Sequence, residues 1–324
     1  MAGSAAVELR RRYEEIRGGL GQYVHVLAVA AGLKPCIDDW VGANRLDDYL
    51  ALLADLGLTW VLDCWFDGIE DPGQVVGSDH LTTTVAGGVA PEMPAPPHAE
   101  AHVFVARSRD QAAVAQASGR YPVVANGRVL PKPWIDHIRF GQALGYPVCC
   151  VKSFARHSRW HADNPLWHAF LGSASPSILA NSLPKHQGRS WMMHLPCSWS
   201  CEATMSQSRR LREHVREVDI DLADAVDQAC TGTFLVLNEL EAYRLAGARP
   251  AGERTAYVRA ELLPSTRPTH PLRRLMAQGD HVEVDLACVR VYQGTEFLGA
   301  HEARCDTLGP EMAHLVRFSG DSDG

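Results

Sequence analysis

Several stretches of the chain place apolar residues three or four positions apart, which is the spacing of one helical face. This spacing predicts helices over residues 5–17, 46–56, 134–144 and 202–218. Glycine, the residue that most often follows a helix, stands directly after two of them, as Gly57 and Gly145. The apolar run 22–31 mixes alanine with valine, so it fits a helix or a strand.

Between these helices, short runs rich in β-branched and aromatic residues predict strands. These strands cover residues 58–66 and 102–106. A helix is expected after the second strand, at residues 111–117. Residues 121–130 contain Asn126-Gly127, which predicts a tight hairpin. The order helix, glycine, apolar strand is typical of layered α/β proteins. We therefore expect an α/β fold, with a mixed α+β arrangement as the alternative.

The C-terminal part of the chain has a different pattern. Apolar spacing predicts one long or two shorter helices over 221–245, followed by a connection at 249–254. Alternating apolar positions over 282–288 predict a strand, and Gln293-Gly294 turns the chain into 296–301, so a β-hairpin is expected.

These patterns divide the chain into four regions. Residues 1–85 are expected to form an N-terminal α/β region, and residues 86–99 a linker, because two glycines and four prolines interrupt regular structure there. Residues 100–218 are a largely helical region that carries the candidate metal or cluster ligands. Residues 219–324 are expected to form a C-terminal α+β region with helices and a β-hairpin.

Composition narrows the class of protein. A formal charge of −7 and an isoelectric point near 6.1 argue against a nucleic-acid-binding surface. The longest apolar run, Val24 to Leu33, is shorter than the roughly 20 residues that a membrane span needs. The N-terminal segment is charged and does not have the pattern of a secretion signal. We expect a cytoplasmic protein, in which nine cysteines serve as thiols or metal ligands rather than as disulfides.

Four of the cysteines form two pairs that share a local context. Cys149 and Cys150 follow Pro147, and Cys197 and Cys201 follow Pro196. Each pair precedes or opens a predicted helix, where free N–H groups and the helix dipole favour the thiolate form. The pattern therefore predicts that Cys149, Cys150, Cys197 and Cys201 bind one metal ion or cluster.

The remaining cysteines stand alone in apolar or mixed stretches, and we expect them to fill space in the core. They are Cys36, Cys64, Cys230, Cys288 and Cys305. The acidic pairs Asp38-Asp39 and Asp47-Asp48 are expected at helix starts.

The identity of the bound group stays open between three alternatives. Successive side chains on a helix diverge by about 100°, so Cys149 and Cys150 are not expected to reach one small ion together. This favours an iron–sulfur cluster, most simply [4Fe–4S], which accepts thiolates from divergent directions. If only one of the adjacent cysteines binds, an iron is left open for substrate. Zinc is the second alternative, and metal-free reactive thiols are the third.

Histidines offer a different ligand set. Cys150, His157 and His161 fall on one helical face and can bind a mononuclear metal without the second cysteine pair. His194 precedes Cys197 by three residues and, with Lys152 and His157, is a candidate catalytic residue. Weaker candidates for the surroundings of the site are spread over the neighbouring stretch: His168, Lys185, His186, Arg189 and Trp191.

The segment Leu144-Gly-Tyr-Pro-Val-Cys-Cys-Val-Lys-Ser-Phe154, with Pro196-Cys-Ser-Trp-Ser-Cys201 downstream, resembles an uncharacterised family. That family, a domain of unknown function in archaeal and bacterial proteins, carries a Gly-Tyr-Pro-x-Cys-Cys-x₃-Phe signature followed by Pro-Cys-Ser-x₂-Cys. The resemblance covers about 60 residues and implies no activity. It implies only that the four cysteines belong together.

The functional hypothesis is an iron–sulfur metalloenzyme that acts on a small metabolite. The cluster would serve as Lewis acid, sulfur handler or electron carrier, with residues 155–194 around the substrate and a possible redox partner. The alternatives are a zinc-stabilised binding module and a mononuclear enzyme using Cys150, His157 and His161.

Overall fold

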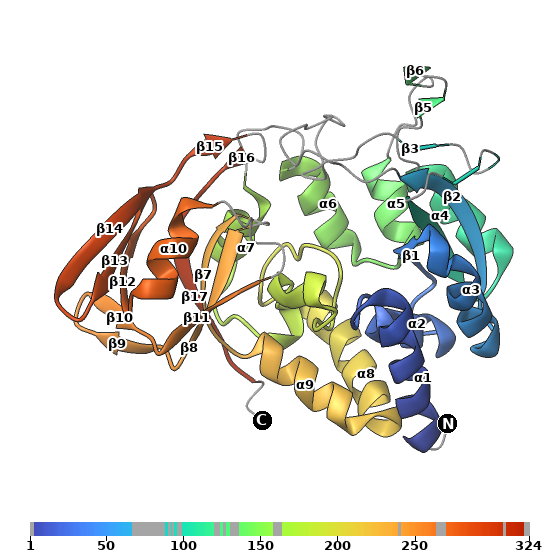
Figure 1. Cartoon of the computed structure of the whole chain (residues 1–324), viewed down its shortest axis with the longest axis horizontal. Helices are drawn as coiled ribbons and strands as arrows, with labels where there is room; N and C mark the ends of the chain where they lie inside the picture. Colours follow the sequence, from blue (N-terminus) through green and yellow to red (C-terminus); the bar gives the residue numbers. More distant parts are fainter. Residues whose placement is uncertain are drawn as a thin grey trace. The chain divides into compact units, whose positions relative to one another are not determined.

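The computed structural model describes residues 3–66, 88–89, 92, 94–95, 99–119, 124–125, 128–129, 136–157, 164–238, 241–263, 270–306 and 309–320. Its helices and antiparallel sheets make it a mixed α/β fold (Figure 1). The chain forms two compact units, one from residues 1–156 with 206–224, the other from 157–205 with 225–324. Within the described residues, no helix combines the length and apolar character that crossing a bilayer requires.

The first unit is built on a four-stranded antiparallel sheet with the order β1-β4-β2-β3. The strands are β1 (Cys36–Gly42), β2 (Thr59–Phe66), β3 (Gly88–Val89) and β4 (Glu100–Ala106). The central strand β4 is fully buried from Ala101 to Ala106, which the apolar composition of this run explains. β2 carries an irregularity between Leu62 and Cys64, where one extra residue, Asp63, enters the strand.

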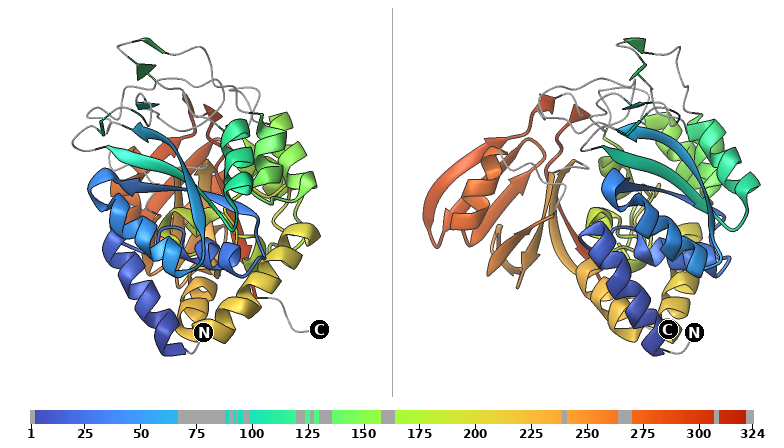
Figure 2. Two further views of the ribbon diagram at one scale, coloured as in Figure 1. Left: turned by 90° about the vertical axis from the view of Figure 1, so that its right-hand side faces the viewer. Right: turned by 45° about the vertical axis from the view of Figure 1, so that its right-hand side comes forward.

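Helices cover both faces of this sheet (Figure 2). α1 (Gly3–Arg17), α2 (Tyr23–Ala30) and α3 (Leu46–Asp55, after the short 3-10 turn Ala43–Arg45) lie on one face. α4 (Arg109–Gly119) packs Ala112 and Ala115 against Phe104 and Ala106 on the other face. The unit thus has three layers, which agrees with the layered fold expected from the sequence.

A buried carboxylate connects the first helical layer to the sheet. Asp39 of β1 accepts hydrogen bonds from the hydroxyls of Tyr13 (2.9 Å) and Tyr49 (2.8 Å), which belong to α1 and α3. Its other oxygen accepts from the Arg17 guanidinium at 3.0 Å and from the backbone N–H of Trp40. Because Asp39 is completely buried, these four donors replace its hydration.

The first unit is completed by helices that carry part of the candidate site. α5 (His137–Ala143) is capped by Asp136 and packs on α6 (Val148–His157). A Cβ on Gly141 of α5 would lie 2.6 Å from the Val151 side chain, so glycine permits this close approach. α8 (Glu202–Val218) contributes its residues from Ser206 onward.

The second unit contains two antiparallel sheets, with the orders β11-β8-β7-β17 and β14-β13-β12-β10-β9. The bounds of their strands follow: β7 Gly232–Asn238, β8 Glu241–Ala246, β9 Arg249–Ala251, β10 Arg254–Ala256, β11 Arg259–Leu262, β12 His281–Asp285, β13 Cys288–Gln293, β14 Glu296–Glu302 and β17 His314–Phe318. Short pairs also occur: β15 (Cys305–Asp306) with β16 (Gly309–Pro310) here, and β5 (Val124–Ala125) with β6 (Arg128–Val129) in the first unit.

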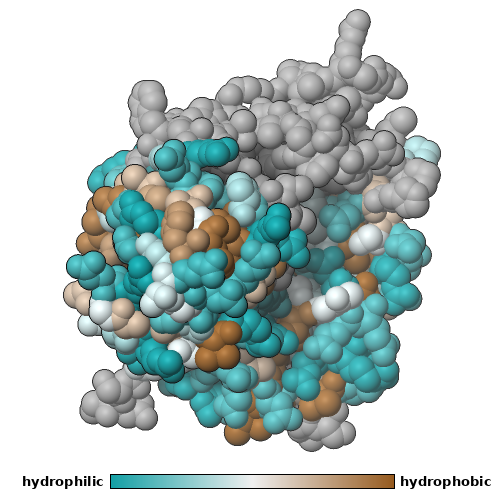
Figure 3. Space-filling model, turned by 60° about the vertical axis from the view of Figure 1, so that its left-hand side comes forward, coloured by the Kyte–Doolittle hydropathy of each residue, from teal (hydrophilic) through white to brown (hydrophobic). Residues whose placement is uncertain are grey.

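One hydrophobic core joins these sheets to α10 (Pro271–Gln278). Leu272 and Met276 of α10 pack with Leu237 of β7 and with Val289 and Val291 of β13. The remaining helical elements are α7 (Pro165–Leu171), α9 (Ile220–Cys230) and the 3-10 turns Ile178–Ala180 and Leu183–Gln187. On the face shown in Figure 3, apolar surface is broken up by hydrophilic side chains.

Most of the predicted elements are confirmed. The helices over 5–17, 46–56, 134–144 and 202–218 correspond to α1, α3, α5 and α8, and the ambiguous run 22–31 is helical as α2. The strands at 58–66 and 102–106, the helix at 111–117, and the pairing predicted near Asn126-Gly127 are also present.

Helix was the wrong prediction for 232–245. Helix α9 ends at Cys230, and Gly232, with φ of 122°, begins β7. The following Thr-Phe-Leu-Val-Leu run is short and β-branched, and in a buried strand such a run imitates helical spacing. The connection predicted at 249–254 forms the hairpin β9–β10. The strand predicted at 282–288 is divided between β12 and β13, and the predicted turn at Gln293-Gly294 connects β13 to β14.

Two residues of the segment 86–99 pair with a strand of the first sheet. Gly88 and Val89 pair with Phe66 and Trp65 of β2. The four prolines come after Val89, so they leave its N–H and C=O free to pair. The first sheet therefore contains strands from both sides of this segment, and the two compact units do not follow the regions 1–85, 100–218 and 219–324.

Candidate metal centre

The first cysteine pair lies in the opening turn of α6. Pro147 precedes the helix and its carbonyl accepts from the N–H of Val151 at 3.0 Å, as expected for proline at a helix start. Cys149 is exposed and Cys150 is buried. Their sulfur atoms lie 3.9 Å apart. The adjacent thiols are therefore turned toward each other.

The second pair brackets a tight turn before α8. Cys201 N–H donates to the Ser198 carbonyl at 3.0 Å, and the Cys201 carbonyl accepts from Met205 N–H as the helix begins. The Ser198 hydroxyl donates to the Gly172 carbonyl at 2.7 Å and accepts from Ser200 N–H, so it holds the turn together. Cys197 is half-buried and Cys201 is buried.

The four sulfur atoms of Cys149, Cys150, Cys197 and Cys201 all lie within 4.8 Å of one another. Four closely spaced cysteines can hold a metal. The two flanking helices begin at or just after the cysteines, which favours the thiolate form that a metal requires.

The sulfur separation in the adjacent pair can be compared with the geometry of a zinc site. Four thiolates around one zinc ion, each about 2.3 Å from it, stand about 3.8 Å apart at the corners of a tetrahedron. The 3.9 Å between Cys149 and Cys150 matches this edge. The two sulfur atoms lie close together although the Cβ directions of adjacent helical residues diverge, because rotation about the Cα–Cβ bonds brings them toward each other.

Aromatic packing in the second unit fixes the loop between Cys197 and Cys201. Trp199 is completely buried, and its ring lies 5.2 Å from that of Phe318 and 6.2 Å from that of Phe170. Its backbone N–H donates to Ser173 Oγ at 2.7 Å, and its carbonyl accepts from the N–H of Ser177. His314 of β17 stands in the same aromatic cluster.

The buried His314 predicts acid sensitivity of this cluster. Burial lowers the pKa of His314 to about 4, although its Nδ1–H donates to the Met312 carbonyl. The native state keeps this histidine neutral, whereas the unfolded chain takes up a proton below about pH 6.5, so stability falls as the pH falls from about 6.5 toward 4. Between pH 7 and pH 5 we expect a loss of about 2 kcal/mol from this residue.

Urea unfolding of the protein and of His314→Gln at both pH values measures this contribution. The variant should lose less free energy of unfolding on acidification, whatever its stability at pH 7. Equal pH dependence of the two proteins would contradict the assignment, and His281→Ala, which removes a half-exposed histidine, is the control.

The other predicted site residues are spread over different environments. His194 is buried, and its Nε2 lies 3.0 Å from Thr204 Oγ1. Lys152 is exposed, and the ring of His157 stacks on that of His168 at 3.7 Å. His161 lies outside the described residues, so the mononuclear set with Cys150 and His157 stays a prediction.

The weaker candidates for the surroundings of the site also differ in their burial. Lys185 is buried, His186 and Arg189 are exposed, and Trp191 donates its Nε1–H to Asp227 at 2.9 Å. Nothing in these contacts assigns them a catalytic role.

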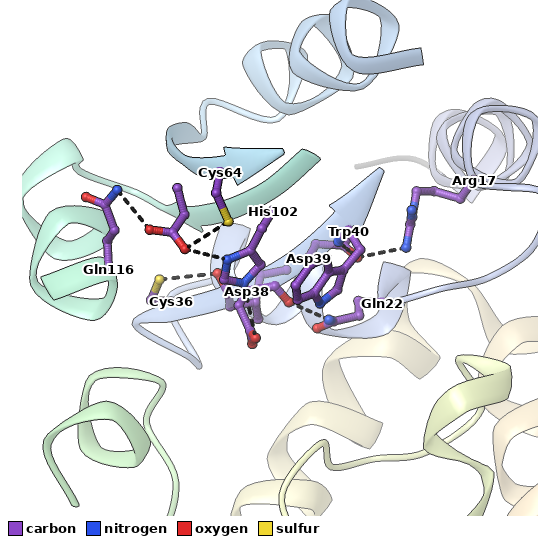
Figure 4. A network of polar contacts seen from close by, with 11 residues as sticks. Arg17, Gln22, Cys36, Asp38, Asp39, Trp40, Cys64, His102 and Gln116 are labelled. Atoms are coloured by element: carbon purple, nitrogen blue, oxygen red, sulfur yellow. Dashed lines mark hydrogen bonds and ion pairs between the residues drawn. The ribbon is translucent and has the colours of Figure 1, made fainter. Parts of the chain in front are cut away.

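Sequence analysis missed a polar cluster on the first sheet (Figure 4). His102 of β4 is fully buried, with Nδ1 3.0 Å from Asp63 Oδ2 and Nε2 3.6 Å from Asp38 Oδ2. Cys64 Sγ lies 3.5 Å from the same Asp63 oxygen, and Gln116 of α4 donates to the other oxygen. The irregularity in β2 places Asp63 and Cys64 on the face of His102.

This cluster places the imidazole of His102 between two carboxylates. Burial alone would lower the pKa of His102, but the neighbouring carboxylates of Asp38 and Asp63 outweigh it and raise the pKa. Trp40 stacks on the ring at 4.2 Å, a contact that suits a cation. Burial lowers the pKa of the nearby Lys34 to about 8.

One expectation for the residues near this cluster is wrong. Asp38 and Asp39 lie in β1, not at a helix start, whereas Asp47 and Asp48 do open α3. Cys36, Cys64 and Cys230 are buried as expected, and burial raises the pKa of Cys36 to about 12. The sequence holds two signals that could have indicated this polar cluster. They are an aspartate inside the apolar run 58–66 and a histidine at the start of the run 102–106.

Comparison with known proteins gives one match. Residues 121–222 match the model of a family described as a protein of unknown function (DUF483). A domain of unknown function therefore covers this range, which contains all four cysteines and agrees with the resemblance seen in the sequence. No curated protein and no solved structure matches the chain.

Proposed function

We propose that this chain is a zinc protein in which Cys149, Cys150, Cys197 and Cys201 hold one Zn²⁺ ion. The observation that carries the proposal is the 3.9 Å separation of the Cys149 and Cys150 sulfur atoms, the spacing of thiolates on a single tetrahedral ion. Thiolates on the different irons of a cubane cluster stand farther apart, and the 4.8 Å limit on all four sulfur atoms favours one ion over a cluster.

Such a centre would be structural. Four thiolates complete the coordination of zinc and leave no position for water or substrate. Since the ligands come from positions nearly fifty residues apart, binding would contribute to folding and would couple the cysteine segments to each other. The protein would then be a zinc-stabilised binding module, with its ligand recognised elsewhere on the chain.

The second candidate is an iron–sulfur enzyme acting on a small metabolite with the help of a redox partner. The exposure of Cys149 favours it, because a cluster held by Cys150, Cys197 and Cys201 alone would keep one iron accessible from the solvent side. The cluster would then act as Lewis acid, sulfur handler or electron carrier.

Metal analysis of protein purified without oxygen separates the two candidates. We expect colourless protein that contains zinc and no acid-labile sulfide. The variants Cys150→Ser and Cys197→Ser should each lose one equivalent of zinc, and a chelator should lower the melting temperature of the unmodified protein.

The control is Cys230→Ser, because Cys230 is a fully buried thiol outside the group of four whose sulfur donates to backbone carbonyls. This variant should keep its full zinc content. Brown protein with matching iron and sulfide, lost in Cys150→Ser, would replace the zinc proposal by the cluster. Unchanged metal content in both cysteine variants would refute both.

A further inference from the structure

Three side chains of the second unit converge from separate elements without any cysteine among them. His270 stands directly before α10, His301 lies near the end of β14, and Glu311 precedes β17. Their ligand atoms, two imidazole nitrogens and a carboxylate oxygen, all lie within 4.8 Å of one another. None of the three was singled out by sequence analysis.

The carboxylate of Glu311 is shared between the two histidines. His270 Nε2 lies 3.1 Å from Oε1, and His301 Nε2 lies 2.7 Å from Oε2. The backbone N–H of Arg304 also donates to Oε2 of Glu311 at 3.1 Å. The group therefore presents a carboxylate and two imidazoles at one point.

The site is enclosed. The exposed fractions of the His270, His301 and Glu311 side chains are only 7%, 3% and 5%. His301 lies opposite Val289 in the β13–β14 pairing, and Leu272, two residues after His270, belongs to the same core as Val289. A surrounding of this kind limits solvent access and strengthens electrostatic binding.

A second layer of contacts is already in place around His270. Its Nδ1 lies 3.4 Å from Oε1 of Glu241, and that oxygen accepts the Tyr243 hydroxyl at 2.6 Å. Metal-bound histidines usually donate their other ring N–H to a carboxylate in this way, which fixes the ring and its tautomer.

The same nitrogen also faces a donor, because the N–H of Leu272 points to His270 Nδ1 at 3.3 Å. The two contacts suit opposite tautomers. When Nε2 carries the proton and donates to Glu311, Nδ1 accepts from Leu272. When Nε2 is free to bind an ion, Nδ1–H donates to Glu241. His270 thus has a hydrogen-bond partner in both states.

We propose that His270, His301 and Glu311 bind one divalent transition-metal ion, Zn²⁺ or Fe²⁺, at a site separate from the four cysteines. Two imidazoles with one carboxylate are the donor set of mononuclear zinc and non-haem iron sites. Three protein ligands leave at least one position for water or substrate, so this ion would be able to activate a bound water. This site goes beyond the proposed function, because the zinc ion at the cysteines only stabilises the fold, whereas an ion at this second site would take part in a reaction.

Cobalt substitution of the full-length protein tests this site independently of the cysteines. Co²⁺ bound by thiolates shows an intense sulfur-to-metal absorption in the near ultraviolet, whereas Co²⁺ bound by nitrogen and oxygen shows only weaker visible bands. We expect titration of the metal-free protein to give both signals. His301→Ala and Glu311→Gln should each remove the visible, sulfur-free component and one equivalent of cobalt, and keep the sulfur band.

Two further variants sharpen the result. Glu241→Gln should weaken sulfur-free binding by about 10- to 100-fold, the usual effect of removing a carboxylate that orients a ligating histidine. His281→Ala, at another histidine paired with a carboxylate in this unit, should change neither signal. Competition with Zn²⁺ and with Fe²⁺ under anaerobic conditions then identifies the preferred ion.

The proposal is overturned if the unmodified protein shows no sulfur-free cobalt component, or if Glu311→Gln, which preserves size and can still hydrogen-bond, keeps it. Absence of the sulfur band with the sulfur-free bands present would instead refute the proposed cysteine centre alone.

Discussion

Asp39→Ala is expected to lower the free energy of unfolding by about 3–5 kcal/mol, the usual effect of removing one partner of a buried ion pair. The substitution leaves the Arg17 guanidinium, whose side chain is 15% exposed, without the carboxylate that it contacts at 3.0 Å. It also deprives the hydroxyls of Tyr13 and Tyr49 of their common acceptor inside the protein. Urea unfolding followed by circular dichroism measures the loss.

The matched control is another aspartate–arginine pair that involves α1. Arg12 contacts Asp55 at 2.9 Å, but the two side chains are 38% and 55% exposed. Exposed pairs contribute about 1 kcal/mol or less, so Asp55→Ala should have a small effect. If Asp39→Ala and Asp55→Ala destabilise the protein equally, Asp39 does not hold the helical layer on the sheet as described.

Trp199→Ala is expected to destabilise the protein by about 3–5 kcal/mol and to weaken metal binding at the cysteines as well. The stability loss follows from the cavity that a completely buried indole leaves among Phe170, His314 and Phe318. The binding loss follows because Trp199 is the middle residue of the loop from Cys197 to Cys201. Calorimetric unfolding and zinc titration measure the two effects separately.

Trp191 supplies the comparison that separates these effects. It is also a buried tryptophan of the second unit, bonded to Asp227, but it lies outside the cysteine loop. Trp191→Ala should therefore cost stability of a similar size and leave zinc affinity nearly unchanged. Equal zinc affinity in Trp199→Ala and Trp191→Ala would show that the indole of Trp199 does not position the cysteines.

The local pattern of apolar and polar residues predicts many of the helices and strands. Helices α1, α3 and α8 could be predicted because each repeats one apolar face along its length. The run 232–245 failed because a strand buried on both faces loses its alternation, so only Gly232 and the β-branched residues distinguished it from a helix. Pairing of β3 with β2 depends on contacts more than twenty residues apart, which no local pattern encodes.

The same distinction applies to the candidate sites. The four cysteines could be grouped because pairing and proline context repeat along the sequence, but the proposal of zinc depends on the side-chain rotation of Cys149 and Cys150. His270, His301 and Glu311 share no local motif, and only the packing of strands and α10 brings them together. Sites assembled by tertiary structure alone leave no spacing to recognise.

The extra residue in β2 has a consequence for changes in chain length. Up to Leu62, odd-numbered positions of β2 face α4, yet Cys64 shares that side because Asp63 is inserted ahead of it. Deleting Asp63 would leave Cys64 on this side of the sheet and remove one carboxylate. Deleting Thr59, Trp60 or Val61 would instead force either the residues between the deleted position and Asp63, or those upstream of the deletion, to exchange their sides of the sheet. We therefore expect this segment to tolerate substitution more readily than shortening.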